Sequence, residues 1–542
     1  MRGLMQDWPL LTHTILDHAA KFHGDREIVS RSVEGPIHRT TYAEISARSR
    51  QLADALRRYG IAEGDVVASL AWNTWRHVEL WYGAMGLGAV VHTVNPRLFP
   101  DQLDYIVNHG GGRLMFTDLT FLPLLEALAP KLTHIEAFIV LTGPRTMPET
   151  SLPGATDYET FIGQGDVGFS WPKLDENTAC GLCYTSGTTG NPKGVLYSHR
   201  SNILHAMACA APDLFGLRAR DVLMPVVPMF HANAWATIFM APMVGCKLVM
   251  PGAAMDGASL HQLLEDEQIT VTAAVPTIWM MLLQHLEKTG GALPCLERVY
   301  IGGAACPEII IESFEEKYGV EVFHAWGMTE MSPIGTAYSP LADTGQLDGA
   351  ALRKLKLKQG RAPYSVDLRI ADDDGNALPR DGKAFGHLQA RGPAVVAEYY
   401  KSENETIIDD QGWFDTGDVS TIDADGFMEI TDRAKDVIKS GGEWISTIAL
   451  ENITVGHPDV TEAAAIGVAH PKWGERPLLI VIARDQSDIS RDDILEHLSS
   501  RIAKWWMPDD VIFVEEIPHT ATGKINKLAL RDKFGQHKLP GL

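Results

Sequence analysis

A stretch rich in glycine and hydroxyl groups, YTSGTTGNPKG at residues 184–194, carries the clearest chemistry of this sequence. It follows the apolar segment ACGLC, which is typical of a strand. Glycines let backbone N–H groups approach an anion, hydroxyls add donors, and Lys193 supplies a point charge. The combination predicts a loop that holds a polyphosphate. It is not a Walker A loop, because no G-x4-G-K-[ST] pattern aligns with it.

Three further segments contain residue types suited to a nucleotide. IGGAACP at 301–307 offers small residues against which a planar base could lie. HAWGMTE at 324–330 ends in a hydroxyl and a hard carboxylate, and these suit a phosphate and magnesium. GWFDTGD at 412–418 ends in Asp418, whose carboxylate could accept hydrogen bonds from two ribose hydroxyls. Taken singly, each has an ordinary explanation as a strand-to-helix turn, a solvated carboxylate or a turn aspartate.

The elements that must position these residues alternate between helical and strand patterns. Residues 41–60 predict a helix that stops at Gly60, 65–70 a buried strand and 77–85 another helix. Repetition of this unit predicts α/β layers with mostly parallel strands. From about residue 360, short strands with Asp-Gly and Gly-Asn turns predict a β-rich subdomain. The last hundred residues suggest a small α+β domain, with a helix over 490–504.

The predicted fold class is therefore α/β. A large multi-layer N-terminal domain spans residues 1–433, with mostly parallel sheets and a β-rich subdomain at about 360–433. A small, mobile α+β C-terminal domain spans 434–542.

Composition excludes several classes of protein. The 542 residues include 47 Lys+Arg and 69 Asp+Glu, and a net charge of -22 is a poor match to nucleic acid or anionic lipid. Six cysteines argue against a disulfide framework, and Cys180 and Cys183 are predicted to point to opposite faces of one strand. The longest uncharged apolar run, 234–246, is shorter than the roughly 20 residues that a membrane-spanning helix needs. No signal peptide is evident, so a cytoplasmic protein is expected.

The loop at 184–194 resembles the phosphate-loop signature of the acyl-adenylate-forming enzymes, a family that includes acyl-CoA synthetases, peptide-synthetase adenylation domains and firefly luciferase. Further motifs similar to that family follow in the expected order: 301–307, 324–330, 412–418, DRAKD at 432–436 and TGK at 522–524. The resemblance covers nearly the whole chain. It implies ATP, Mg²⁺ and coenzyme A, and two half-reactions. A carboxylate attacks the α-phosphate of ATP to give acyl-AMP and pyrophosphate, and a thiol then displaces AMP.

The resemblance also implies roles for individual residues. The nucleotide would be bound by Thr185, Ser186, Gly187, Thr188, Thr189, Gly190, Lys193, Gly303, Ala304, Ala305, Trp326, Gly327, Met328, Thr329, Asp418, Arg433 and Lys524. Glu330 would bind Mg²⁺, and Thr185 would contribute through phosphate or water. The implied catalytic residues are Lys524, Thr329 and His231. Of these, Lys524 would bridge the substrate carboxylate and the α-phosphate, where negative charge develops.

The segment PVVPMFHANAW at 225–235 resembles the acyl-pocket element of medium- and long-chain fatty acyl-CoA synthetases. The implied acyl pocket consists of His231, Trp235, His324 and Met331, with Trp235 at the position of a residue proposed to gate the acyl tunnel. Lys435 falls on the hinge position about which the small domain turns between half-reactions. The CoA side would be formed by Lys439, Gly441 and Gly442.

The segments HTVNPRLFP and KSGGEWIS resemble bacterial medium-chain acyl-CoA synthetases and 3-methylmercaptopropionyl-CoA ligases. If the small Ala394 faces the pocket, more acyl length fits, which favours a medium-chain fatty acid over 3-methylmercaptopropionate. Two alternatives stay open: an adenylating enzyme with a non-CoA acceptor, and a non-catalytic nucleotide-binding protein. The partners expected are a carboxylic acid, ATP and CoA, without nucleic acid or a transmembrane segment. A homodimer is left open.

Overall fold

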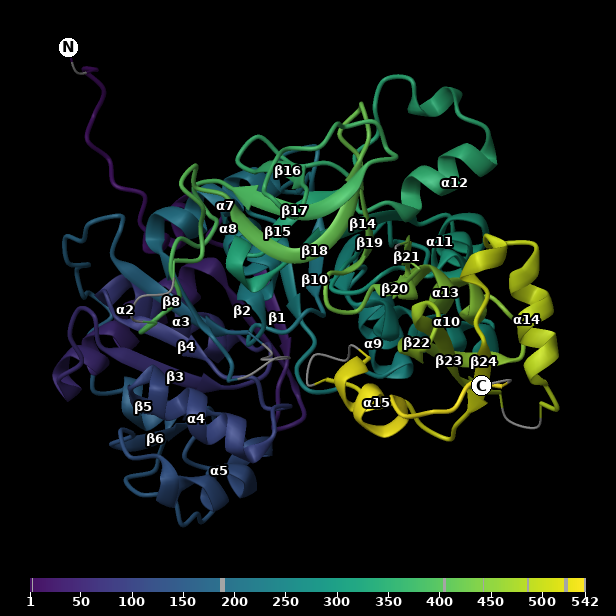
Figure 1. Cartoon of the computed structure of the whole chain (residues 1–542). Coiled ribbons are helices and arrows are strands. Elements are labelled where there is room, and N and C mark those ends of the chain that lie inside the picture. The colour runs from purple at the N-terminus through teal and green to yellow at the C-terminus, as the bar shows by residue number, and fades with distance from the viewer. Residues whose placement is uncertain are drawn as a thin grey trace.

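The computed structural model describes residues 1, 3–185, 191–402, 406–441, 443–484, 487–520 and 525–540. Two mainly parallel sheets form the larger part of the molecule, and two mainly antiparallel sheets follow them in the sequence. Figure 1 shows the C-terminal elements gathered on the right, apart from β3, β5 and β6 at the lower left. The predicted fold class, α/β with a β-rich subdomain and a small α+β C-terminal domain, is confirmed.

The first sheet runs in the order β7-β6-β5-β3-β4-β8-β9, and only its edge pair β8–β9 is antiparallel. All five residues of β3 are buried, as expected of a parallel strand with both faces covered. The bounds are β3 (Val66–Leu70), β4 (Val90–Thr93), β5 (Gly112–Thr117), β6 (Ala137–Val140), β7 (Thr156–Asp157), β8 (Ala179–Tyr184) and β9 (Gly194–Ser198).

The second sheet runs in the order β15-β14-β13-β12-β10-β11-β1-β2, and it is parallel except at its two edges. A shared apolar core joins the two sheets, with Val67 and Val91 from the first beside Leu223 and Val271 from the second. The bounds are β1 (Glu27–Arg31), β2 (Ile37–Thr41), β10 (Val222–Pro225), β11 (Lys247–Met250), β12 (Val271–Ala274), β13 (Arg298–Ile301), β14 (Glu321–Gly327) and β15 (Ile334–Ala337).

Helices cover both sheets. The predicted helix over 41–60 is α2, which begins with a capping box at Thr41 and ends at Gly60 in the left-handed conformation. The bounds in this part of the chain are α1 (Thr12–Phe22), α2 (Tyr42–Tyr59), α3 (Trp75–Leu87), α4 (Pro100–Gly110), α5 (Leu122–Leu128), α6 (Tyr158–Ile162), α7 (His199–Ala210), α8 (Thr237–Val244), α9 (Gly257–Asp266), α10 (Pro276–Thr289), α11 (Glu308–Glu312) and α12 (Gly349–Leu357).

The third sheet is the predicted β-rich subdomain, with antiparallel order β16-β17-β18-β19. The fourth sheet belongs to the C-terminal domain and runs β21-β20-β23-β22, with β24 parallel to β23. The bounds are β16 (Asp367–Ala371), β17 (Phe385–Arg391), β18 (Phe414–Ile422), β19 (Met428–Arg433), β20 (Ile438–Ser440), β21 (Glu443–Ile445), β22 (Val460–His470), β23 (Gly474–Ala483), β24 (Asp510–Phe513), α13 (Thr447–Val455), α14 (Arg491–Ser499) and α15 (Lys527–Phe534).

One predicted element is shorter than expected. The helix predicted over 490–504 begins as expected, with Ser490 capping Asp493, but it ends at Ser499. Ile502 packs against the C-terminal core although it lies beyond the end of the helix. Its apolar side chain therefore continued the helical spacing in the sequence, and the predicted helix was too long. The change from the third to the fourth sheet falls between Arg433 and Ile438. The boundary predicted at 433/434 stays a prediction.

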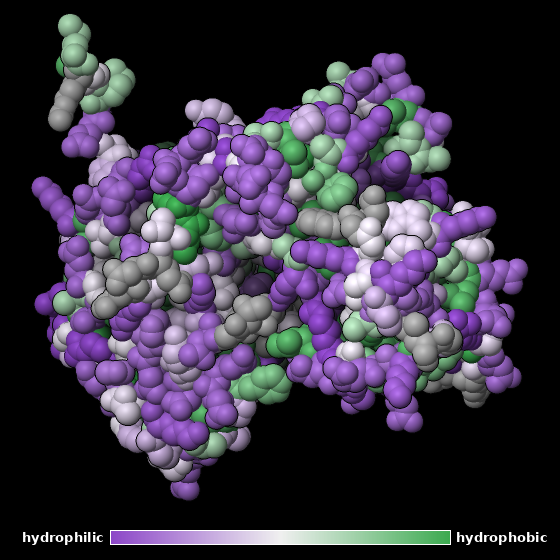
Figure 2. Space-filling model, in the orientation of Figure 1, coloured by the Kyte–Doolittle hydropathy of each residue, from purple (hydrophilic) through white to green (hydrophobic). Residues whose placement is uncertain are grey.

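The visible face of the molecule is mostly hydrophilic, and a hollow opens near its centre (Figure 2). In the described part of the chain, no helix is long and apolar enough to cross a membrane. The six cysteines all lie in that part and are free thiols. Cys180 and Cys183 lie three residues apart on β8, where one accepts from Asn202 and the other contacts Thr93, as expected for strand thiols.

Candidate functional site

The predicted phosphate loop connects β8 and β9, whose pairing ends with Tyr184 opposite Gly194. Two hydrogen bonds close the base of the loop. Thr185 N donates to the carbonyl of Lys193 over 2.9 Å, and Lys193 N donates to Thr185 Oγ1 over 3.1 Å. The remaining predicted loop residues, Ser186, Gly187, Thr188, Thr189 and Gly190, lie outside the described residues.

Tyr399 lies between two predicted site residues from different motifs. Lys193 Nζ lies 4.7 Å from the centre of the Tyr399 ring, and the Tyr399 hydroxyl donates to Glu330 Oε1 over 2.9 Å. Val396 N donates to the Glu330 carbonyl over 2.7 Å, so the segment that carries Tyr399 lies against Glu330. Tyr399 was not predicted from the sequence. Its only signal is a pair of tyrosines at the end of an otherwise small-residue segment.

Thr329 and Glu330 form a short turn, Thr329–Met331, directly after β14. Both residues are buried, so Glu330 is not the solvated carboxylate that its position alone would suggest. Tyr197 on β9 donates to the Thr329 carbonyl over 2.7 Å, which ties this turn to the strand that follows the phosphate loop. A hollow of about 430 Å³ lies beside Glu330 and Tyr399.

Magnesium is a hard cation that proteins often hold by one carboxylate together with substrate phosphates. The described residues contain no group of three or more His, Cys, Asp or Glu that could hold a metal unaided. A single buried carboxylate beside the base of a phosphate loop suits an ion that arrives with ATP. Glu330 therefore fits the predicted role.

The two residues predicted to bind the ribose, Asp418 and Arg433, lie on neighbouring antiparallel strands. Asp418 on β18 stands opposite Arg433 on β19, and Arg433 Nε lies 2.8 Å from Asp418 Oδ1. The other carboxylate oxygen, Oδ2, accepts from Trp326 Nε1 over 2.9 Å. Because a carboxylate oxygen can accept more than one hydrogen bond, both oxygens can still accept from hydroxyls. Trp326, predicted as a nucleotide contact, thus orients Asp418.

The glycine pair at 302–303 lies against the side chain of Trp235. A Cβ at Gly302 would lie 3.2 Å from the Trp235 ring and 3.0 Å from the Ala325 carbonyl. Gly303 has a φ of 81°, which favours glycine. Ala304 beside it is exposed. The role of this stretch in binding a planar base stays a prediction.

The segment after His231 has an unusual backbone. Residues 232–236 all have positive φ, between 44° and 61°, and none is glycine. Such a conformation is unfavourable for L-residues and persists only where the surroundings fix it. Within the turn, Asn233 Nδ2 donates to Asn202 Oδ1 over 3.1 Å. The buried Trp235 packs with Tyr300 and other core residues.

Two predicted acyl-pocket residues, His324 and Met331, do not share the apolar cluster of Trp235. Phe323 and Ala325 of β14 share the apolar cluster of Trp235, so His324 between them points to the opposite face of the sheet. There its Nδ1 contacts the Leu357 carbonyl at 2.9 Å, and burial lowers the pKa of His324 to about 4. Met331 packs in a separate cluster with Trp326. On β14, Phe323 and Ala325 therefore share the apolar cluster of Trp235, whereas His324 does not. The acyl pocket of His231, Trp235, His324 and Met331 stays a prediction.

Ala394 faces the hollow beside Glu330, whereas the prediction of a longer acyl group needed it to face the acyl pocket. Its carbonyl accepts from Ser332 Oγ over 2.9 Å, and it lines the hollow beside Glu330. Neither His231 nor Trp235 lines that hollow. The small side chain at 394 therefore leaves room beside Glu330, and it gives no support for a longer acyl pocket.

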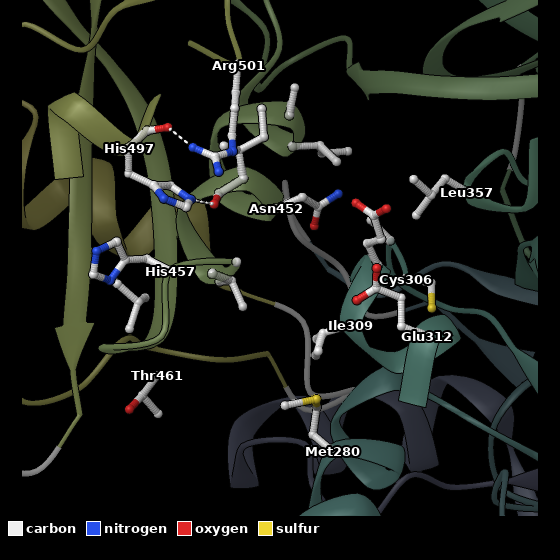
Figure 3. Close-up of a pocket in the computed structure, with 18 of the residues that line it drawn as sticks. Met280, Cys306, Ile309, Glu312, Leu357, Asn452, His457, Thr461, His497 and Arg501 are labelled. Atoms are coloured by element: carbon white, nitrogen blue, oxygen red, sulfur yellow. Dashed lines mark hydrogen bonds between the residues drawn. The ribbon is translucent and has the colours of Figure 1, made fainter. Parts of the chain in front are cut away.

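A cleft of about 1430 Å³ separates the N-terminal part of the chain from the C-terminal domain. Figure 3 shows Met280, Ile309 and Glu312 on one wall, and His457 and His497 on the other. Ala305 and His324 also line it, so the predicted base-binding segment opens into this cleft.

Neighbouring residues of the hinge region are bound to different domains. Asp432 Oδ2 accepts from Thr447 N over 2.6 Å and from Thr447 Oγ1 over 2.7 Å, whereas Arg433 pairs with Asp418. Lys435, the predicted hinge, lies two residues after Arg433 and is exposed; its carbonyl accepts from Arg531 over 3.2 Å.

On the predicted CoA side, Lys439 is exposed and its N–H donates to Glu475 Oε2 over 2.9 Å. Gly441, with a φ of 63°, donates to the Trp473 carbonyl over 2.7 Å. Gly442 and Lys524 lie outside the described residues.

Comparison with known families decides what this site belongs to. Residues 16–400 match the AMP-binding enzyme family, and 449–524 match the AMP-binding enzyme C-terminal domain. The chain belongs to the AMP-binding enzyme family. The predicted resemblance to acyl-adenylate-forming enzymes is thereby confirmed.

Relatives within the AMP-binding enzyme family match over almost their full length. A 3-methylmercaptopropionyl-CoA ligase of Ruegeria lacuscaerulensis is 50% identical, covering 98% of this chain and 99% of the relative. A medium-chain-fatty-acid–CoA ligase of Ectopseudomonas oleovorans is 48% identical, and the match covers 99% of this chain and 98% of the relative. The crystal structure of the anthranilate CoA ligase AuaEII with anthranoyl-AMP superposes with a TM-score of 0.86 at 25% identity, covering 98% of this chain and 99% of the other.

Proposed function

We propose that this AMP-binding enzyme is an ATP-dependent acyl-CoA synthetase. The observation that carries the proposal is the contact of Tyr399 with both Lys193 and Glu330, which brings a phosphate-binding cation and a metal-binding carboxylate together. The Asp418–Arg433 pair supplies the matching ribose site. The relatives at 48–50% identity are named as CoA ligases.

In the first half-reaction, a carboxylate oxygen of the acid attacks the α-phosphorus of ATP. The bond from that phosphorus to the bridging oxygen of the β-phosphate breaks, and pyrophosphate leaves with the electron pair. Lys193 and the loop hold the departing phosphates, Thr329 lies at the α-phosphate, and Asp418 holds the ribose. Lys524 supplies positive charge where negative charge develops in the transition state. Bound Mg²⁺, held by Glu330, would neutralise phosphate charge.

In the second half-reaction, the CoA thiol attacks the acyl carbon of acyl-AMP. The thiol proton is lost, the bond to the AMP oxygen breaks, and AMP leaves. We propose that CoA enters along the cleft between the domains, because Ala305 and His324 already open into it. Rotation at Lys435 would remove Lys524 and bring Lys439, Gly441 and Gly442 to the reacting centre.

We propose a medium-chain fatty acid as the substrate. Trp235, which follows His231 by four residues, belongs to an apolar cluster with Phe323 and Ala325, and this suits an aliphatic tail better than a charged one. The relative named medium-chain-fatty-acid–CoA ligase supports this choice. The alternative is 3-methylmercaptopropionate, which the name of the 50% identical relative suggests.

The test measures acyl-CoA formed from ATP, Mg²⁺ and CoA across straight-chain acids of four to sixteen carbons, with 3-methylmercaptopropionate included. A maximum between six and twelve carbons would support the proposal. A preference for 3-methylmercaptopropionate would establish the alternative acid with the same mechanism. Pyrophosphate release without thioester would indicate a non-CoA acceptor, and no ATP-dependent product from any acid would contradict the enzyme assignment.

Two further predictions concern the whole protein. A homodimer stays a prediction, which light scattering at several protein concentrations will check. A cytoplasmic location also stays a prediction, and fractionation of the source cells will check it.

A further inference from the structure

Asn73 joins the two parallel sheets at the edge that carries the site. It lies just after β3 of the first sheet and is buried. Its side chain reaches the segment 225–229, which follows β10 of the second sheet. Asn73 Nδ2 donates to the carbonyls of Pro225 and Val227, each over 2.9 Å, and Asn73 Oδ1 accepts from Met229 N over 2.7 Å. Both donor hydrogens and the acceptor of the carboxamide are therefore used.

The backbone groups that Asn73 binds are buried and lie at or beyond the end of β10. A buried carbonyl or N–H without a partner destabilises the folded state, so these groups need Asn73 in the observed position. The residue before Asn73, Trp72, contacts the residue that directly follows this segment, Phe230. The Trp72 ring lies 5.9 Å from the Phe230 ring, and Trp72 N donates to Asp118 Oδ2 over 2.6 Å.

The segment bound by Asn73 leads directly into the candidate acyl site. Two residues after Met229 comes His231, and the turn with positive φ begins at the next residue. That turn orients Trp235 against Gly302. Because it contains no glycine, its geometry depends on fixed ends. One end is α8, where Thr237 Oγ1 donates to the Ala234 carbonyl over 2.5 Å, and the other is the segment bound by Asn73.

We propose that Asn73 is a positioning residue for acid binding: its carboxamide fixes residues 225–229 so that His231 and Trp235 face the acyl group. Asn73 does not touch the substrate and acts through the backbone. The inference rests on the proposed function, since it assumes that His231 and Trp235 bind the acid.

The test variant is Asn73→Asp. It keeps the size of the side chain but replaces both N–H donors with an oxygen that faces two carbonyls. We expect the KM for the acid to rise about tenfold, while the KM for ATP stays within about threefold. The chain-length profile should also broaden. Trp72→Leu removes the ring contact with Phe230, which directly follows the segment, and it should move the acid KM in the same direction if Asn73→Asp folds poorly.

Asn108→Asp is the matched control. Asn108 also uses its carboxamide on backbone, donating to the Lys131 carbonyl over 3.0 Å and accepting from Thr133 N over 2.9 Å, and neither partner belongs to the proposed acyl site. It should leave both KM values and the chain-length profile unchanged. An Asn73→Asp enzyme with lower thermal stability but an unchanged acid KM and profile would overturn the proposal. Equal increases in both KM values would overturn it as well.

A second readout does not depend on turnover. Amide hydrogen exchange in residues 225–236 should be faster in Asn73→Asp than in the wild type, and unchanged in Asn108→Asp. Unchanged exchange there would contradict the positioning role even if the acid were misidentified. If exchange is faster in Asn73→Asp but the wild-type enzyme activates no acid, the error lies in the proposed function, and the role of Asn73 in fixing residues 225–229 still holds.

Discussion

The Tyr399 hydroxyl donates a 2.9 Å hydrogen bond to Glu330 Oε1, the proposed metal-binding carboxylate, and Lys193 Nζ lies 4.7 Å from the centre of the same ring. A hydrogen bond to a charged group contributes roughly 1.5–3 kcal/mol. We therefore expect Tyr399→Phe to raise the Mg²⁺ concentration needed for half-maximal pyrophosphate release by about tenfold. Tyr364→Phe, at a fully exposed tyrosine, is the control. An unchanged magnesium titration in Tyr399→Phe would show that Glu330 needs no such orientation.

Trp326→Phe should weaken ATP binding without affecting the acid. It removes the Nε1 donor that orients Asp418 Oδ2 while retaining an aromatic ring in the core. The expected change is a rise of about tenfold in the KM for ATP, since the lost hydrogen bond involves a carboxylate. The control is Arg391→Lys, which alters an exposed ion pair with Asp367 in the sheet that also carries Asp418. It should change neither KM. A larger effect on the acid than on ATP would assign Trp326 to the acyl site.

Lys524→Ala should separate the two half-reactions. We expect carboxylate-dependent pyrophosphate release to fall by about a hundredfold or more, because the variant lacks the positive charge of Lys524 where the transition state develops negative charge. Attack of CoA on supplied acyl-AMP should stay largely intact. Lys533→Ala, an exposed lysine on α15, is the control. Equal loss of both half-reactions would contradict the rotation at Lys435.

Trp235→Ala should change the chain-length preference more than the affinity for ATP. Removing the indole opens space beside Gly302, so longer acids should gain relative to shorter ones. Gly302→Ala tests the same contact from the other side, because its Cβ would lie 3.2 Å from the Trp235 ring. The measurement is kcat/KM for each acid from four to sixteen carbons. A profile unchanged in both variants would make Trp235 a core residue only.

Buried histidines should make the protein unstable in mild acid. Burial lowers the pKa of His205 to about 3, and its Nε2 accepts from Ile334 N over 2.9 Å, which requires the neutral ring. The unfolded chain binds the proton near pH 6.5, so the stability present above that pH is lost progressively as the pH falls toward the folded pKa. At pH 5.5, such a histidine makes the free energy of unfolding about 1.4 kcal/mol lower than it is well above pH 6.5.

The measurement for this prediction is urea unfolding at pH 7.5 and 5.5. His205→Gln should lose less stability between the two pH values than the wild type, because glutamine does not titrate. His134→Gln, at an exposed histidine, should lose as much as the wild type. Identical losses in all three proteins would show that His205 does not set the pH dependence.

The sequence predicted the strands that carry the site better than it predicted their faces. The parallel strands appeared as short apolar runs, and the helix from Tyr42 to Tyr59 had both end signals. However, β14 is buried from Val322 to Trp326, so no alternation of polar and apolar residues showed where His324 points.

By itself, the sequence determined which chemical groups are present and the strands and turns they follow, because glycine, hydroxyl and carboxylate patterns act over a few residues. Lys193, Glu330 and Asp418 could be named in this way, whereas Arg433 was named through the resemblance of DRAKD at 432–436 to the family. Only the tertiary structure decided which groups meet. Tyr399 contacts Glu330 and Asn73 binds residues 225–229, although these partners are far apart in the chain. Such contacts depend on how two sheets pack, and no local pattern encodes that.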